Sequence, residues 1–130
     1  MTKYEIFVRA LTNLHEIETE EPPYDVITMT GMVFLFKICF DQTWKAMKEQ
    51  LELCGYGDHR TGSPRAVIKM AYQAGMIQDE QLWLDALTAR NNVAHSYNEN
   101  IAMGIIKESR ERFIPMFEAV KRELKQNWIG

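Results

Sequence analysis

The sequence predicts an all-α protein, an up-and-down four-helix bundle with one additional short helix. Apolar residues recur at three- and four-residue spacing along four long segments, which is the periodicity of helices that bury one face. Alternation typical of strands is absent, and turn-forming residues gather between the segments. With 130 residues, of which 46% are hydrophobic and 25% charged, the chain is long enough for one core. We therefore expect residues 1–130 to form a single helical domain.

The N-terminal segment and the most apolar run both argue against membrane insertion. Lys3 and Arg9 interrupt the stretch that a secretory signal would need to keep apolar. The run from Met29 to Phe40 is too short to span a bilayer and contains Lys37. We expect a cytoplasmic protein without a membrane segment.

The charge is unevenly distributed along the chain, although the formal net charge is only −3. Residues 1–58 carry five basic and ten acidic side chains, a balance of −5, whereas residues 59–130 carry ten basic and eight acidic ones, a balance of +2. A polyanion is therefore expected to approach the second half of the chain.

The first helix is predicted from Lys3 to Glu18, and the dipeptide Pro22-Pro23 stops it from continuing. Its apolar stripe consists of Tyr4, Phe7, Val8, Leu11 and Leu14.

The second helix carries the longest apolar seam in the sequence. Its members follow one another at steps of three or four residues: Met29, Val33, Phe36, Phe40, Trp44, Met47, Leu51 and Cys54. Such a seam is typical of a helical bundle. Gly55 is expected at the C-cap, and Gly31 is expected to loosen the first turn, at a cost of about 1 kcal/mol relative to alanine. Cys39 and Cys54 lie too far apart on this helix for a disulfide, and we expect both thiols to be buried.

The segment from Gly55 to Ser63 is predicted to be an interhelical loop. A glycine-rich loop before a helix can bind phosphate, but no strand precedes this one and the Lys-Ser/Thr pair of a P-loop is missing. Cys54 and His59 do not belong to a set with zinc-ligand spacing. We expect no metal site there.

Three helix starts follow in the second half of the chain. Ser63-Pro64 is typical of an N-cap followed by proline at the first helical position, and predicts a short helix that ends near Gly75. Asp79 is expected to cap the next helix, which runs to about Val93. The pattern Ser96-x-x-Glu99 predicts a capping box that opens the C-terminal helix at Ser96, and that helix is expected to kink at Pro115.

The candidate functional residues lie at the joint between the last two long helices, in the octapeptide Arg90-Asn91-Asn92-Val93-Ala94-His95-Ser96-Tyr97. The N-terminus of a helix attracts anions because its first N–H groups have no partners within the helix and the positive end of the helix dipole lies there. Histidine can take a proton from a ribose 2′-OH or give one to the leaving 5′-oxygen. Arginine stays charged and stabilises negative charge on phosphoryl oxygens.

A purely structural explanation of the same residues remains open at this point, in which Arg90 caps carbonyl groups and His95 fills the loop. If the residues are functional, RNA cleavage by Arg90 and His95 requires neither a metal nor a cofactor. One copy supplies only one proton-transfer group, so two copies that meet in a homodimer make a better site.

The spacing Arg90-x4-His95-x-Tyr97 resembles the signature of the HEPN superfamily, the higher eukaryotes and prokaryotes nucleotide-binding domains. Further matches extend from about residue 36 to 117. Together they resemble the nucleotidyltransferase substrate-binding protein family within that superfamily, on Phe40-x3-Trp44-Lys45, Leu51-x3-Gly55, Ser63-Pro64-Arg65, Ala71, Gly75, Leu82-Trp83-Leu84, Arg90-Asn91 and His95-Ser96-Tyr97-Asn98-Glu99.

This resemblance implies a dimeric helical bundle produced together with a minimal nucleotidyltransferase. In related HEPN toxins, the residues matching Arg90 and His95 act in RNA cleavage. The residue matching Tyr97 receives AMP from the nucleotidyltransferase, which silences the toxin. Asn91 is expected to support the site through hydrogen bonds.

Three functional hypotheses follow. The first is a metal-independent endoribonuclease of a toxin–antitoxin type pair, with Arg90 and His95 catalytic and Tyr97 as the modification site. The second, recorded in the family's name, is a non-catalytic subunit that binds nucleotide or substrate for the nucleotidyltransferase. The third is a helical interaction module whose polar joint only caps helices.

Overall fold

The computed structural model describes residues 1–57 and 62–129, and these residues form helices without any strand. His59, considered above as a metal ligand, lies outside them. The α-helices are α1 (Lys3–Leu14), α2 (Val26–Leu53), α3 (Pro64–Gln73), α4 (Glu80–Asn92), α5 (Glu99–Glu108) and α6 (Ile114–Glu123). Shorter segments adjoin them: the 3₁₀ segments η1 (His15–Thr19) and η2 (Val93–His95), and the π-helical segments η3 (Ser109–Phe113) and η4 (Leu124–Trp128).

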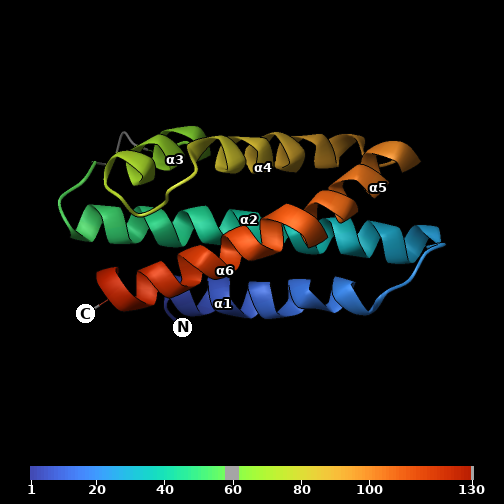
Figure 1. The fold of residues 1–130 in the computed structure, drawn as a ribbon, viewed down its shortest axis with the longest axis horizontal. Helices are drawn as coiled ribbons and strands as arrows, with labels where there is room; N and C mark the ends of the chain where they lie inside the picture. Colours follow the sequence, from blue (N-terminus) through green and yellow to red (C-terminus); the bar gives the residue numbers. More distant parts are fainter. Residues whose placement is uncertain (58–61, 130) are drawn as a thin grey trace.

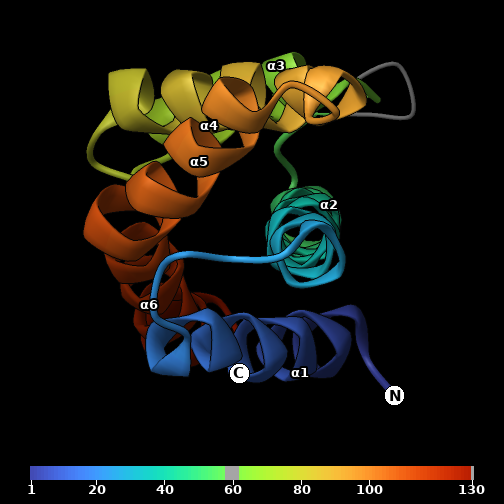
Figure 2. The same cartoon turned by 90° about the vertical axis from the view of Figure 1, so that its right-hand side faces the viewer.

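The long helix α2 is the axis of the bundle (Figure 1). Viewed along α2, α1 lies on one side, α3 and α4 lie on the opposite side, and α6 lies on a third (Figure 2). The α5–η3–α6 segment crosses the molecule diagonally from the end of α4 to the side of α1. The four long helical segments and the short α3 confirm the predicted bundle with one additional helix.

Local sequence signals set both ends of α2. The Asp25 carboxylate accepts a hydrogen bond from the Thr28 N–H at 2.7 Å and so caps the first turn. At the other end Gly55 adopts φ +85°, a conformation that costs glycine little, and the Tyr56 N–H bonds to the Leu51 carbonyl at 2.8 Å. The helix ends at this glycine as predicted, although the C-cap residue itself is Cys54 and Gly55 follows it.

The apolar seam of α2 is mostly buried, and its aromatic members form the centre of the core. Phe36 is fully buried and stacks on Phe113, with a ring-centroid distance of 5.2 Å. Phe117 packs against both Phe36 and Trp83. The last member of the seam differs from the prediction, because Cys54 is exposed; it follows the last helical residue, where the chain turns into solvent. Cys39 is buried as predicted, and burial raises the pKa of its thiol.

The two caps predicted in the middle of the chain are confirmed. The Ser63 hydroxyl accepts a hydrogen bond from the Ala66 N–H at 3.1 Å, and Pro64 is the first residue of α3. The Asp79 carboxylate accepts one from the Leu82 N–H at 3.0 Å, so α4 begins at Glu80.

The C-terminal helix is irregular where Pro115 was expected to disturb it. A five-residue segment that precedes α6, Ser109–Phe113, adopts π-helical geometry, and Pro115 lies in the first turn of α6. Proline has no N–H for the usual bond to the residue four positions earlier, so the local change in helical pitch follows from its chemistry.

α2 is long and apolar enough to cross a membrane by length and composition alone, since an 18-residue window reaches a mean hydropathy of 1.2. Ten of its 28 residues lie in the core of the bundle. The core role accounts for much of this hydropathy.

His15 links the end of α1 to α6 and predicts a weak dependence of stability on pH. The predicted first helix is α-helical only to Leu14, and His15 begins η1. The His15 ring bonds to Glu18 through Nδ1 and to Glu118 through Nε2, the latter at 2.8 Å. A neutral imidazole has only one N–H, so donation to both carboxylates requires the protonated ring. The hydrogen bond to Glu18, opposed by desolvation and supported by Glu118, raises the pKa of His15.

The folded-state pKa of His15 therefore exceeds its unfolded value of about 6.5. The stabilisation is complete below the unfolded pKa and is lost as pH rises through the folded pKa. We expect a loss below about 1 kcal/mol, because the His15 side chain is 37% exposed and solvent screens the pair. Urea unfolding at about pH 6 and about pH 8.5 measures it. An equal loss in His15→Gln would contradict this assignment.

Candidate functional site

The joint between α4 and α5 contains the four candidate site residues Arg90, Asn91, His95 and Tyr97. α4 ends at Asn92 and passes into the 3₁₀ segment η2, which ends at His95. The Ser96 N–H then bonds to the Val93 carbonyl at 3.1 Å, and the Asn98 N–H bonds to the His95 carbonyl at 3.0 Å. This tight connection turns the chain from α4 into α5 (Figure 1).

The predicted capping box at Ser96 is wrong, because the N-cap of α5 is Asn98. The Asn98 side-chain oxygen accepts hydrogen bonds from the N–H groups of Asn100 at 2.9 Å and Ile101 at 3.3 Å. Asparagine caps helices at least as well as serine, and Ser96 is already held in the turn that follows η2. Tyr97 consequently lies in the connection before α5 rather than in the first turn of the helix.

Arg90 is held in place by an acidic residue of α2. Its Nε donates to Asp41 Oδ1 at 2.8 Å and its Nη2 donates to Asp41 Oδ2 at 3.2 Å, a two-point contact that fixes the plane of the guanidinium group. Lys37 Nζ donates to the same carboxylate at 3.1 Å. These are the only hydrogen bonds recorded for the Arg90 side chain within residues 1–57 and 62–129. Arginine has five N–H groups, so the contact with Asp41 does not use them all.

Electrostatics favour the ionised forms of Asp41 and Arg90. Burial of Asp41 opposes its ionisation, but hydrogen bonds from Arg90 and Lys37 outweigh this effect and lower the pKa of the carboxyl. The hydrogen bond to Asp41 raises the pKa of Arg90. Together Lys37, Asp41 and Arg90 carry a net charge of +1, and the Arg90 side chain is 33% exposed, so part of the cation faces solvent.

His95 and Tyr97 lie together at the surface. Their rings meet edge to face, with centroids 6.4 Å apart and an interplanar angle of 73°. Tyr97 is 88% exposed, and His95 and Asn91 are exposed as well. Among the described residues, no recorded hydrogen bond or ring contact joins this pair to Arg90, which points toward α2. In a single copy, Arg90 is therefore held against α2, while His95 and Tyr97 form a separate exposed pair.

Sequence reasoning missed Asp41 and Lys37 as parts of the site. They are four residues apart on α2, so they share a face of that helix. The sequence does carry one signal for them: Lys37 is a charged residue within the most apolar run of the chain, and the acidic Asp41 follows it one helical turn later. Neither residue indicates Arg90 as the partner, because 49 positions separate Asp41 from it.

The Asp41–Arg90 contact predicts a measurable loss of stability in Asp41→Asn. This change removes the charge from a side chain that is only 15% exposed and leaves two cations adjacent to each other. We expect a decrease of about 1–2 kcal/mol in the free energy of unfolding. Lys37→Ala, which keeps the Arg90 contact, is the matched control and should lose less than about 1 kcal/mol. Equal losses in the two variants, measured by urea unfolding, would contradict a special role for the Arg90 contact.

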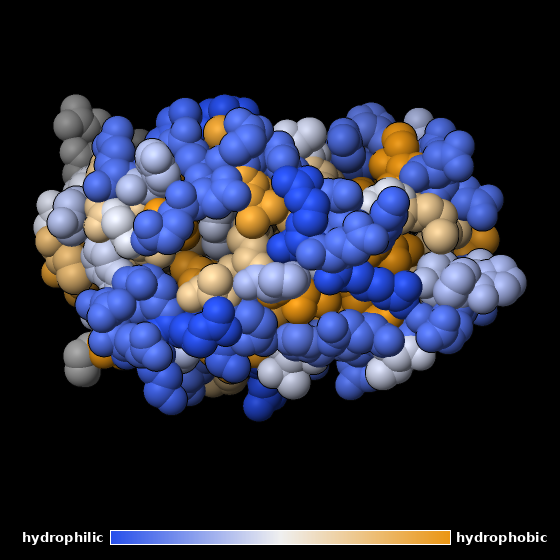
Figure 3. All heavy atoms as spheres, in the orientation of Figure 1, coloured by the Kyte–Doolittle hydropathy of each residue, from blue (hydrophilic) through white to orange (hydrophobic). Residues whose placement is uncertain are grey.

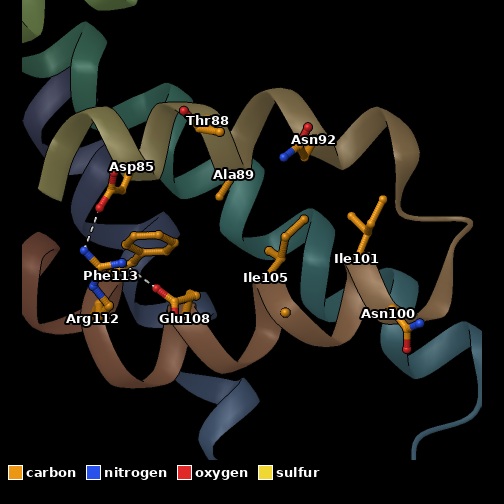
Figure 4. A pocket seen from close by; sticks show the side chains of 11 residues that line it. Asp85, Thr88, Ala89, Asn92, Asn100, Ile101, Ile105, Glu108, Arg112 and Phe113 are labelled. Atoms are coloured by element: carbon orange, nitrogen blue, oxygen red, sulfur yellow. Dashed lines mark hydrogen bonds and ion pairs between the residues drawn. The ribbon is translucent and has the colours of Figure 1, made fainter. Parts of the chain in front are cut away.

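A groove of about 400 Å³ runs between α4 and the α5–η3 segment next to the joint. Ala89, Ile101 and Ile105 supply apolar surface, while Asn92 and Asn100 lie near the end at the joint (Figure 4). Arg112 closes the far end through bonds to Asp85 at 2.8 Å and Glu108 at 2.6 Å. On the face of the molecule shown in Figure 3, hydrophobic residues, in orange, are visible between hydrophilic ones, in blue.

Metal coordination has no evident site in the described part of the chain, where no cluster of three or more His, Cys, Asp or Glu residues occurs. The chemistry available at the joint is therefore that of a fixed guanidinium, an exposed imidazole, an exposed phenol and a neighbouring groove.

Comparison with solved structures shows the same fold in two bacterial proteins. A Thermus thermophilus protein is 26% identical, with a TM-score of 0.79 over 92% of this chain and 99% of that one. A Haemophilus influenzae protein, described as having the fold of a substrate binding domain of a nucleotidyltransferase, is 18% identical, with a TM-score of 0.80 over 95% of this chain and 99% of that one.

A search of curated proteins finds no match. The profile of the family described as "Nucleotidyltransferase substrate binding protein like" matches residues 2–126, which is nearly the whole chain and includes the joint. The chain belongs to the nucleotidyltransferase substrate binding protein like family.

Proposed function

We propose that the protein is the HEPN subunit of a two-component toxin–antitoxin type system and acts as a metal-independent endoribonuclease. Its partner is a minimal nucleotidyltransferase. The observation that carries the proposal is the joint itself, where Arg90 is fixed by Asp41 beside a surface on which His95 and Tyr97 are in contact and exposed. A structural role would leave the imidazole and phenol bonded within the bundle, whereas here both face solvent.

The reaction requires one proton to leave the ribose and one to reach the leaving group. His95 accepts the proton of a 2′-OH while the 2′-oxygen attacks the neighbouring phosphorus and the bond to the 5′-oxygen breaks. The products are a cyclic phosphate and a free 5′-OH, whose proton comes from an imidazolium. Arg90 stabilises the charge that builds on the non-bridging oxygens.

A homodimer supplies the second proton-transfer group. A single copy offers one imidazole at the joint, and the hydrogen bonds recorded for Arg90 among the described residues go to Asp41 and not to this imidazole. Two joints that face each other give one histidine for the base and one for the acid, with two guanidinium groups for the phosphate. RNA is accordingly the substrate, and the shared cleft is the place of cleavage.

Tyr97 is the proposed site of silencing. Its phenol oxygen attacks the α-phosphorus of ATP, pyrophosphate leaves, and the phenol proton passes to a base of the nucleotidyltransferase. The exposed side chain allows a second enzyme to reach it. The attached AMP places a negative phosphodiester beside His95 and competes with the phosphate of RNA for the same cations.

Intact-mass measurement tests this part of the proposal. The AMP-free protein, incubated with the neighbouring nucleotidyltransferase and ATP, should gain one adenylyl group that maps to Tyr97. Tyr97→Phe keeps the ring and loses the acceptor oxygen, so it should gain none, and the exposed Tyr72→Phe should be modified as wild type. An unmodified wild type that forms no complex with the nucleotidyltransferase would support the bare interaction module instead.

The groove between α4 and α5 favours a second candidate function, a non-catalytic subunit that holds a nucleotide for the nucleotidyltransferase. Its apolar lining with amides near one end is suitable for a base and its polar edge. Calorimetric titration with ATP tests it, with Thr88→Trp as the variant that fills the groove from an exposed position. Binding that Thr88→Trp removes, in a protein that leaves RNA intact, would favour this function over the nuclease.

A further inference from the structure

A hollow of about 760 Å³ lies between α1 and the C-terminal helical segments. Tyr4, Arg9 and Asn13 line it from α1, while Lys121 of α6 and Lys125 of η4 line it from the other side. We name it the α1–α6 hollow. The two helices that bound it lie next to each other in both ribbon views (Figure 1 and Figure 2).

Two hydrogen bonds hold the walls of the α1–α6 hollow together. The Tyr4 hydroxyl donates to the Lys121 carbonyl at 3.3 Å. At the end of α1, His15 bonds to Glu118 of α6 at 2.8 Å. The Tyr4 ring also packs edge to face on the fully buried Phe7, with centroids 6.2 Å apart. The packing of the bundle therefore fixes the distance between the two walls.

Three cations line the α1–α6 hollow without a recorded partner. Lys121 and Lys125 are four residues apart, about one helical turn, and Arg9 lines the same hollow from α1. Among residues 1–57 and 62–129, no hydrogen bond or ion pair is recorded for any of these three side chains. Other cations of the bundle do meet carboxylates, as Lys37 meets Asp41 at 3.1 Å.

The carboxylates beside the hollow are engaged elsewhere. Glu5, the one acidic residue of the described chain that lines the hollow, accepts a hydrogen bond from the Thr2 hydroxyl at 3.3 Å. Glu118 bonds to His15, and Glu123 bonds to two residues of η4. Like charges one turn apart destabilise a helix. The chain has 18 acidic side chains for 15 basic ones, so composition does not force this cluster. A bound anion would offset its cost.

The α4–α5 joint alone offers little attraction for a long polyanion. Lys37, Asp41 and Arg90 together carry a net charge of +1. No lysine or arginine occurs in residues 91–106, where Glu99 adds a negative charge. Sequence-independent binding of a nucleic acid comes almost entirely from contacts of lysine and arginine with its phosphates. A nuclease with this joint therefore needs further cations elsewhere on its surface.

We propose that the α1–α6 hollow binds the phosphate backbone of the RNA away from the joint where the RNA is cut. The inference rests on the proposed function for the identity of the ligand. Arg9 can hold a phosphate through two N–H groups, and Lys121 and Lys125 act as point charges for its neighbours. The Asn13 amide at the edge of the hollow is a further donor.

The position of the hollow predicts that only a long RNA reaches it from the joint. η4, at the red end of the chain, lies at the opposite end of the molecule from the α4–α5 joint (Figure 1). A bound RNA would therefore run along the bundle. The fold also brings Arg9, from the acidic half of the chain, to two lysines of the basic half, which counts of charge along the sequence do not show.

The dependence of RNA binding on salt tests the hollow without any cleavage. The hollow variant is Arg9→Gln/Lys121→Gln/Lys125→Gln, and His95→Ala in every protein of the series prevents cutting. Fluorescence anisotropy of a labelled single strand of about 16 nucleotides gives the slope of log K against log salt concentration. That slope should be smaller in magnitude by about 2 in the hollow variant, since each phosphate contact on a single strand contributes about 0.7.

The matched control removes the same number of charges from exposed positions outside the hollow. It is Arg65→Gln/Lys107→Gln/Arg122→Gln, in which Arg122 is the sequence neighbour of Lys121. The control should keep the wild-type slope. An unchanged slope in the hollow variant, or an equal decrease in the control, would overturn the proposal.

Cleavage kinetics and stability give two further readouts, both with His95 intact. With the RNA of about 16 nucleotides, the hollow variant should show a raised KM and an unchanged kcat, because the lost contacts bind substrate and transition state alike. With an RNA of about four nucleotides, which cannot reach both places, KM should not change. The urea midpoint of the hollow variant should stay the same or rise, because repulsion is removed. A lowered midpoint would show that the cations serve the fold, and would overturn the proposal.

Two competitors test the choice of RNA as the ligand. Inorganic tripolyphosphate that binds the wild type as tightly as the long RNA would overturn the proposal in favour of a free polyphosphate. A glutamate peptide that does so would overturn it in favour of an acidic protein segment.

The hollow and the nuclease can fail independently. RNA binding that the hollow variant loses, in a protein that never cuts RNA, would support the hollow and refute the nuclease. Cutting with the same KM in the hollow variant and the wild type would refute the hollow and leave the nuclease standing.

Discussion

His95→Ala is expected to lower the rate of RNA cleavage by about 10²–10⁴-fold, the usual contribution of a general acid–base group. The fold should be unaffected, because His95 is exposed and its one recorded side-chain contact in the described structure is with the Tyr97 ring. Cleavage of a labelled RNA in the presence of a chelator measures the rate, and urea unfolding verifies the stability. A variant that retains wild-type cleavage would exclude His95 from the mechanism.

Arg90→Ala is the companion change and should lower the rate by about 10²–10³-fold through lost stabilisation of the phosphoryl oxygens. It also leaves Asp41 with Lys37 as its only recorded partner in the described residues, so we expect part of its effect to come through stability. Arg90→Ala/Asp41→Ala separates the two effects, because it removes the unpaired carboxylate while keeping the catalytic defect. Lys107→Ala, which removes an exposed cation of α5, should cleave normally.

Phe36→Ala is expected to reduce the free energy of unfolding by about 3–5 kcal/mol. Phe36 is fully buried at the centre of the bundle and packs on Phe40, Phe113 and Phe117, so its loss leaves a cavity bounded by three helical segments. A bundle of this size has roughly 5–15 kcal/mol of stability to lose.

The control for the core prediction is Tyr72→Ala. Tyr72 is an aromatic residue of α3 that is 47% exposed, and its removal should change the free energy of unfolding by less than about 0.5 kcal/mol. Urea unfolding of both variants at one protein concentration makes the comparison. A loss below about 1 kcal/mol in Phe36→Ala would contradict the packing described for the aromatic core.

The helices could be predicted from sequence because their signals are local. Ser63 and Asp79 each bond to an N–H three residues later, and the seam of α2 needs only its own periodicity. The start of α5 was missed because Ser96 and Asn98 are both good caps. The choice between them depends on η2, a 3₁₀ turn that has no distinct sequence pattern.

The site could be predicted only in part. The octapeptide placed Arg90, His95 and Tyr97 at one joint, and the structure agrees. It could not indicate Asp41, because that contact forms only when α2 and α4 pack together. Nor could periodicity reveal that Ile27 and Phe34 of α2 are exposed, since both are as apolar as residues of the core and only the folded bundle shows which face of the helix is left uncovered.

The most direct test of the account is to incubate AMP-free wild-type protein with RNA in excess chelator. The account predicts cleavage that leaves a cyclic phosphate and a free 5′-OH, that is absent from His95→Ala, and that stops when Tyr97 carries AMP. RNA that remains intact at high concentrations of well-folded, unmodified protein would contradict it.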